Sequence, residues 1–166
     1  MKALVVYESM FGNTATVARA VAAGLAGTFD VTLADVQDMP PVAGADLLVV
    51  GAPTHAFGMS RPSTRTDAAK QGDVRAGAQQ TGIREYLDNT PELAGLPVAA
   101  FDTKVKMALL PGSAAGKALR RLRGLGGRPV LSAESFRVVG TAGPLVAGEL
   151  ERAQQWAQGI GAASPP

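Results

Sequence analysis

A short turn near the N-terminus contains the residue types that hold a phosphate group. It reads YESMFGNT over residues 7–14 and follows the apolar run at residues 3–6. Ser9 and Thr14 offer hydroxyl donors, and Asn13 offers an amide. Gly12 lets the backbone approach a ligand closely. A helix that begins here would add unpaired backbone N–H groups and about half a positive charge. Because the turn holds no Lys or Arg, we predict a phosphate monoester that belongs to a larger ligand.

The same turn closely resembles the FMN phosphate loop of flavodoxin-like proteins. In that family a hydroxyl residue, two further residues and then Gly-Asn-Thr wrap the ribityl phosphate. The resemblance implies FMN as cofactor, with its phosphate bound by Ser9, Met10, Phe11, Gly12, Asn13 and Thr14. Phe11 departs from the pattern, because many short flavodoxins have a second Thr there. A turn that only caps a helix is the alternative interpretation.

A second segment, GAPTHAFGMS at residues 51–60, resembles the flavin-contacting loop of the flavodoxin-like quinone reductases. The resemblance implies that the flavin ring is contacted by Pro53, Thr54, His55, Phe57 and Gly58. Phe57 is the candidate for the apolar wall, or alternatively a loop anchor in the core. His55 is the only histidine and the candidate catalytic residue, able to hydrogen-bond the flavin or pass a proton. A solvated loop histidine is the alternative.

A third segment, FDTKVKM at residues 101–107, is expected to meet the ring from the end of a later strand. We expect Asp102, Thr103 and Lys104 to frame the flavin. Many electron-transfer flavodoxins carry a Tyr here that stacks on the outer face, whereas Met107 is the only large soft side chain in this segment. An open outer face would suit a substrate or hydride donor, which weakens the simple-carrier interpretation.

The elements that position these loops follow from the alternation of apolar runs with helical patterns. We predict helices over residues 12–25, 113–123 and 148–158. We predict strands over 3–6, 29–33, 46–50 and 97–101, and a split last strand at 130–131 and 136–139. Such alternation favours a parallel sheet. The resemblance implies a doubly wound, three-layer α/β/α sandwich whose five parallel strands have the order 2-1-3-4-5. Flavodoxin is itself the standard example of this order, with FMN between strands 1 and 3.

Composition bounds the remaining possibilities. The 166 residues suit one domain, which we expect to span residues 1–158, followed by a flexible tail at 159–166. With no cysteine and one histidine, we expect no disulfide, thiolate chemistry or metal site. No apolar run reaches the roughly 18 residues of a membrane span, and no signal-peptide pattern precedes the first strand. We therefore expect a cytoplasmic protein. The polar insert at 59–82 lacks a clear period, and we expect it to be a partner-selecting cover whose deletion over residues 62–78 spares flavin retention.

The positive charges cluster, although the formal net charge is only +2. Between Thr103 and Ala133 the chain has seven basic residues and no acidic one. Electron-carrying flavodoxins are typically acidic, so the cluster departs from the family pattern. It is either a solvated helix face or a basic rim that attracts an acidic partner or the 2′-phosphate of NADPH. We expect no nucleic-acid partner, since interleaved aromatics are lacking. Lys104 and Lys106 near the ring would make its two-electron potential less negative.

These observations lead to one favoured function and two alternatives. We predict a flavodoxin-like redox protein that carries electrons through non-covalently bound FMN, with a redox partner protein. An NAD(P)H-dependent quinone reductase that uses the same FMN site is the enzymatic alternative, favoured by the open outer face. A flavin-free binding module on the same fold is the third possibility.

Overall fold

The computed structural model describes residues 1–106 and 111–164. Its first half contains β1 (Lys2–Tyr7), α1 (Asn13–Leu25), β2 (Asp30–Asp35), the short 3-10 helix η1 (Val36–Asp38), β3 (Leu47–Pro53), α2 (Pro62–Ala69) and α3 (Ile83–Asp88). Its second half contains β4 (Pro97–Val105), α4 (Ala114–Gly124), β5 (Arg128–Pro129), β6 (Glu134–Val138) and α5 (Glu149–Ala163). None of the helices in these ranges is both long enough and apolar enough to cross a membrane.

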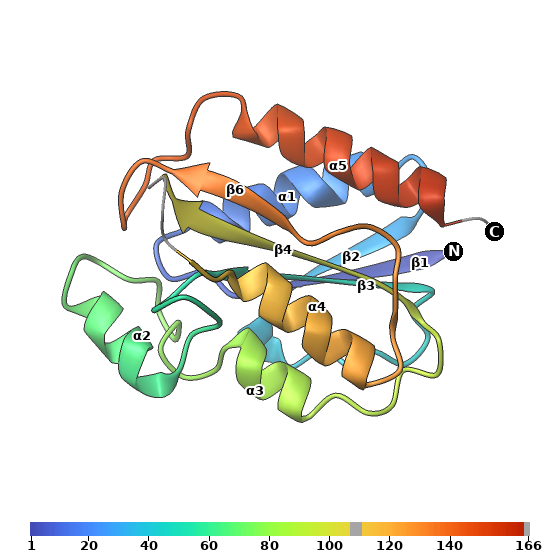
Figure 1. Ribbon diagram of the computed structural model, residues 1–166, viewed down its shortest axis with the longest axis horizontal. Coiled ribbons are helices and arrows are strands. Elements are labelled where there is room, and N and C mark those ends of the chain that lie inside the picture. Colours follow the sequence, from blue (N-terminus) through green and yellow to red (C-terminus); the bar gives the residue numbers. More distant parts are fainter. Residues whose placement is uncertain (107–110, 165–166) are drawn as a thin grey trace.

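The strands form one parallel sheet of order β2-β1-β3-β4-β5, and β6 also pairs with β4. Helices α1 and α5 cover one face, and α3 and α4 cover the other (Figure 1). The expected three-layer sandwich and its strand order are thereby confirmed. The last strand position is split as expected, although its first part lies at Arg128–Pro129 rather than at residues 130–131.

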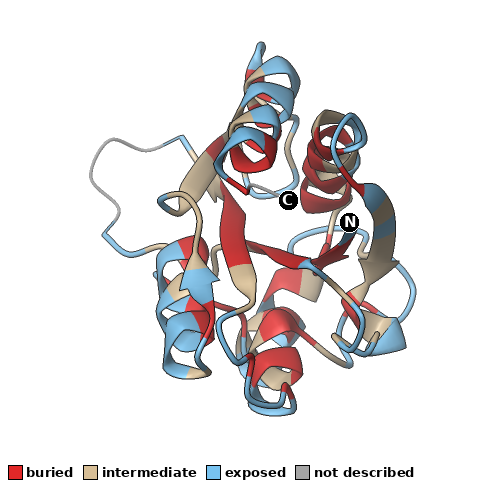
Figure 2. Cartoon of the chain, turned by 90° about the vertical axis from the view of Figure 1, so that its right-hand side faces the viewer, coloured by how far each residue is buried: buried red, intermediate tan, exposed pale blue. Residues whose placement is uncertain are grey.

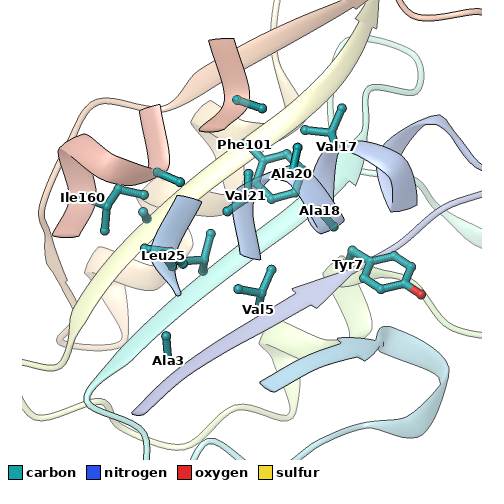
Figure 3. Close-up of a cluster of buried hydrophobic side chains, with 14 of the residues drawn as sticks. Ala3, Val5, Tyr7, Val17, Ala18, Ala20, Val21, Leu25, Phe101 and Ile160 are labelled. Carbon is teal, nitrogen blue, oxygen red and sulfur yellow. The ribbon is translucent and has the colours of Figure 1, made fainter. Parts of the chain in front are cut away.

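Each face of the sheet has its own hydrophobic core because strand side chains alternate between faces. In β1, Ala3 and Val5 belong to the core beneath α1 and α5, while Leu4 and Val6 belong to the core beneath α3 and α4. Figure 2 shows the buried sheet between the two layers of helices. Figure 3 shows the first core, to which Val5 of β1, Leu25 of α1 and Ile160 of α5 all belong. With both faces covered, the strands read as continuous apolar runs.

Several boundaries differ from the sequence-based expectations. Strand β4 continues to Val105 rather than ending at Phe101, because its neighbours β3 and β6 pair with it as far as Thr103 and Val105 respectively. Helix α5 continues to Ala163 rather than Gln158, so residues 159–163 are not a flexible tail. Ile160 and Gly161 are buried in this last part of the helix. The insert at 59–82, for which no period was found, contains α2.

Candidate functional site

The phosphate-loop residues form a tight turn at the carboxyl end of β1. Helix α1 begins at Asn13, after Gly12 in a left-handed conformation with φ of 100°. A non-glycine residue there would be strained by about 1 kcal/mol or more. The backbone N–H of Gly12 donates to Ser9 Oγ at 3.1 Å, which leaves the Ser9 hydroxyl proton free to donate elsewhere. The first N–H groups of α1 have no acceptor within the helix, as in any helix.

Thr14 joins this turn to the end of β4. Its Oγ1 lies 2.7 Å from Thr103 Oγ1, and both residues are buried. Two hydroxyl groups that share one hydrogen bond retain one O–H between them. Thr14 and Thr103 therefore supply one further donor beside the helix start.

A cavity of about 320 Å³ opens beside this turn, at the carboxyl ends of the strands. The expected residues that line it are Ser9, Met10, Phe11, Asn13, Thr14, Pro53, Thr54, His55 and Thr103. The expected residues Gly12, Phe57, Gly58, Asp102 and Lys104 are not among its lining. Met107 lies outside the described residues. The three loops thus converge as the strand order requires, although they contribute fewer side chains to the cavity than expected.

Asp102 is fully buried beneath the cavity wall instead of lining it. Its Oδ2 accepts hydrogen bonds from the Thr54 hydroxyl at 3.0 Å and the Ser113 hydroxyl at 2.6 Å. The backbone N–H of Ala115, in the first turn of α4, donates to the same oxygen at 2.9 Å. A carboxylate is stabilised at a helix start. Asp102 therefore holds Thr54 and the start of α4 in place. Because the Thr54 hydroxyl donates its proton to Asp102, it has no proton left to donate into the cavity.

Phe57 lies in a two-residue turn that faces outward. Residues His55 and Gly58 exchange two backbone hydrogen bonds of 2.7 and 2.8 Å, and between them Ala56 and Phe57 have φ of 42° and 72°. Phe57 is half exposed, so it is neither a cavity wall nor a core anchor. Lys104 lies near the turn, where its Nζ donates to Gly112 O at 2.6 Å.

His55 lines the cavity with a neutral imidazole. Burial, and to a smaller extent the positive charge of Arg65, lowers the pKa of His55 to about 4. Its Nδ1 lies 3.3 Å from Thr64 Oγ1 in α2. With the pKa lowered in this way, His55 is neutral at pH 7. The ring can therefore offer a hydrogen bond but not a positive charge.

The insert forms one wall of the cavity, which sequence reasoning did not predict. The lining side chains that it contributes are Thr64, Asp67, Ala68 and Gln71. Ala68 and Ala78 pack with Met10 of the phosphate turn, and the N–H of Arg75 donates to Met10 O at 2.9 Å. In Figure 1, α2 lies at the carboxyl end of the sheet. Pro62 at the first helical position was the available start signal for this helix.

A buried ionic network anchors this wall. Arg65 is 0% exposed and donates through Nη2 to Glu85 Oε1 of α3 at 2.7 Å. Its Nη1 donates to Ser60 Oγ at 2.8 Å, and the Ser60 hydroxyl in turn donates to Glu8 Oε1. Burial raises the pKa of Glu8, against the opposing effect of its hydrogen bonds from Ser60 and from the N–H of Ile83. Glu8 immediately precedes Ser9, so the network connects α2 and α3 to the phosphate turn.

The donor set fits a phosphate monoester. The turn brings together the first N–H groups of α1, the Ser9 hydroxyl and one O–H of the Thr14–Thr103 pair. No Lys or Arg occurs among the described residues that line the cavity. Helix starts and hydroxyl groups bind phosphate without a cationic side chain. The cavity beside the turn leaves room for a larger group attached to that phosphate.

Comparisons with known proteins agree with this fold. The family model described as Flavodoxin matches residues 5–107. The oxidised flavodoxin 1 of Bacillus cereus has 19% identity and a TM-score of 0.70, with 96% of this chain and 97% of that chain covered. A flavodoxin of Streptococcus pneumonia TIGR4 has 18% identity and a TM-score of 0.69, with coverage of 98% and 99%. At these identities the likeness concerns the fold. No curated protein sequence matches this chain.

Proposed function

The chain belongs to the flavodoxin family, and from that premise we propose that it binds FMN non-covalently in the cavity and carries electrons to or from a partner protein. The donor set at the start of α1 is the observation that carries this proposal. When bound, FMN would supply a ring that takes up and releases one or two electrons. The residues of the chain supply position, exclusion of water and electrostatics.

The phosphate turn is the proposed anchor of the cofactor. The Ser9 hydroxyl and the shared hydroxyl of Thr14 and Thr103 donate to the phosphate, together with the N–H groups of Asn13 and Thr14. Gly12 keeps the turn in its left-handed conformation. A hydrogen bond to a charged group contributes about 1.5–3 kcal/mol. Loss of a single hydroxyl should therefore weaken binding by about tenfold or more.

The walls of the cavity are the proposed contacts of the ring. Pro53 and Thr54 lie on the side of β3, and Thr64 and Ala68 of α2 close the opposite side. Asp102 would act on the ring indirectly, because its carboxylate holds Thr54 and the start of α4. His55 is proposed as a neutral hydrogen-bonding group at the ring. Its low pKa disfavours the proton-carrying role among the two that the sequence suggested.

Titration of the flavin-free protein with FMN and with riboflavin tests this proposal. FMN fluorescence should be quenched on binding, and the affinity for FMN should exceed that for riboflavin by at least about a hundredfold, because riboflavin lacks the phosphate. The Ser9→Ala variant should lose about tenfold in FMN affinity and almost nothing in riboflavin affinity. Equal affinity for the two flavins would show that the phosphate turn is not the anchor.

A quinone reductase with the same cofactor site is the competing function. The cavity does not separate it from a carrier, because both would hold FMN there. Steady-state oxidation of NADPH in the presence of benzoquinone separates the two functions. A carrier should show almost no turnover above free FMN, whereas a reductase should turn over at about 1 s⁻¹ or faster.

A further inference from the structure

Phe57 is presented to solvent by a strained turn. It is 50% exposed, and both it and Ala56 have the positive φ that non-glycine residues seldom adopt. Strain of this kind gathers at binding and switching sites, where the surrounding structure holds it in place. The turn therefore sets an apolar ring outward beside the cavity that His55 and Ala56 line.

Two lysine side chains lie close to the backbone of this turn. A Cβ added to Gly58 would lie 2.8 Å from Lys117 Nζ, so the Lys117 side chain lies directly over Gly58. A Cβ added to Gly112 would lie 2.2 Å from Phe57 O, so the turn also contacts Gly112. The carbonyl of Gly112 also accepts the hydrogen bond from Lys104 Nζ. The turn that exposes this aromatic ring thus has two ammonium groups near its backbone.

The positive charge continues along α4. Arg120 is exposed and lies three residues after Lys117, which places both on the same side of the helix. Arg121 is also exposed but forms an ion pair with Asp88 at 3.5 Å. The segment from Thr103 to Ala133 contains no acidic residue. Phe57, Lys104, Lys117 and Arg120 therefore form one apolar and cationic surface, called here the Phe57 surface.

We propose that the Phe57 surface docks a protein that carries a one-electron redox centre behind an acidic surface. This inference rests on the proposed carrier function and names the class of its partner. A central aromatic contact surrounded by charges is the arrangement by which proteins dock on one another, since the ring provides affinity and the charges steer encounter. The NADPH phosphate is the less suitable occupant, because Phe57 faces outward rather than into the cavity.

Amide chemical shifts in a titration test the docking without requiring electron transfer. The ¹⁵N-labelled protein, supplied with FMN, is titrated with an oxidised acidic [2Fe–2S] ferredoxin as the probe and with basic cytochrome c as its counterpart. The ferredoxin should shift the amides of residues 56–58 and 115–121. The Kd for ferredoxin should rise about tenfold between 20 and 200 mM salt. Cytochrome c should leave these amides unchanged.

Matched variants separate the surface from the net charge. Lys117→Glu with Arg120→Glu should weaken ferredoxin binding by about tenfold or more and remove most of its salt dependence. Lys2→Glu with Arg19→Glu alters the net charge equally. Because these two residues lie in β1 and α1, outside the Phe57 surface, this variant should change the Kd by less than about twofold. Phe57→Asn keeps the turn, because Asn tolerates positive φ, and should weaken binding about threefold to tenfold with an unchanged salt slope.

Three outcomes would overturn the proposal: equal losses in the two double variants, ferredoxin-induced shifts confined to other residues, and the same shifts with cytochrome c. A fourth would be an unchanged ferredoxin Kd in Lys117→Glu with Arg120→Glu while the Kd for NADPH rises. Failure of the carrier function has a different signature, because FMN binding and its riboflavin control are measured without any partner.

Discussion

The hydroxyl groups of Thr14 and Thr103 lie 2.7 Å apart, although 89 residues separate them in the chain. Thr14 lies in the first turn of α1, and Thr103 lies near the end of β4. Their hydrogen bond ties the phosphate turn to the carboxyl-terminal part of β4. The proposed phosphate donors therefore come from two segments that are distant in the chain.

Removal of the Thr103 hydroxyl should therefore weaken FMN binding at the phosphate. In Thr103→Val the shape is kept, but Thr14 loses the partner that orients its hydroxyl, and one O–H of the pair is gone. We expect FMN affinity to fall by about fivefold to twentyfold, equivalent to about 1–2 kcal/mol. Riboflavin affinity should be unchanged, and Thr103→Ser should retain FMN affinity near that of the wild type. A loss that is equal for both flavins would place Thr103 at the ring instead.

The pKa of His55 can be measured directly because it is the only histidine. Its single imidazole Hε1 signal should titrate near pH 4 rather than near 6.5 in the folded protein. The cause is burial, followed by the charge of Arg65. Loss of the Arg65 charge should move the pKa upward, provided that the variant remains folded. A midpoint near 6.5 in the wild type would show that the imidazole is solvated.

The same pKa predicts a dependence of stability on pH. The folded pKa of His55 lies below the unfolded value, so the unfolded state binds more protons between pH 6.5 and about 4. Above pH 6.5 His55 does not reduce the free energy of unfolding, because it is neutral in both states. As the pH falls through that window, the free energy of unfolding decreases by about 3 kcal/mol at most. Urea unfolding at pH 7 and pH 5 should show a smaller difference in His55→Gln than in the wild type. Equal differences would contradict the prediction.

The outcomes at particular residues show what sequence patterns can predict. The strand order followed from the family resemblance carried by the octet at 7–14, and the phosphate turn was predictable because that octet is a local signal. The placement of Phe57 and Asp102 was not, since nothing in their neighbours reveals the left-handed turn or the start of α4 that receives Asp102. Helix α2 was not predicted, because its packing depends on contacts between Arg65, Ser60 and Glu85 that the local sequence does not reveal. Tertiary hydrogen bonds produce no periodic pattern in the amino-acid sequence.

Arg65 should be among the most important residues for stability. Replacement by Met leaves Glu85 and Ser60 without their buried partner, and breaking such a pair costs about 3–5 kcal/mol. Lys70→Met is the matched control, because the ion pair of Lys70 with Asp67 is exposed and contributes less than about 1 kcal/mol. Urea denaturation should show a large decrease in the midpoint for Arg65→Met only. Similar midpoints for the two variants would mean that α2 is not anchored by this network.

Helix α2 should be necessary for flavin retention, which reverses the expectation for the insert drawn from the sequence. The Ala68 side chain of α2 lines the cavity and packs with Met10 of the phosphate turn. Deletion of residues 62–78 would also remove Arg65, so a point variant is the sharper test. In Ala68→Leu the added carbons extend into the cavity or displace Met10, and FMN affinity should fall by about tenfold or more. Ala69→Leu makes the same change one residue further on, at a position that does not line the cavity, and should alter FMN affinity by less than about twofold. If Ala68→Leu binds FMN as tightly as Ala69→Leu and the wild type, α2 is a cover outside the cofactor site and the original expectation for the insert stands.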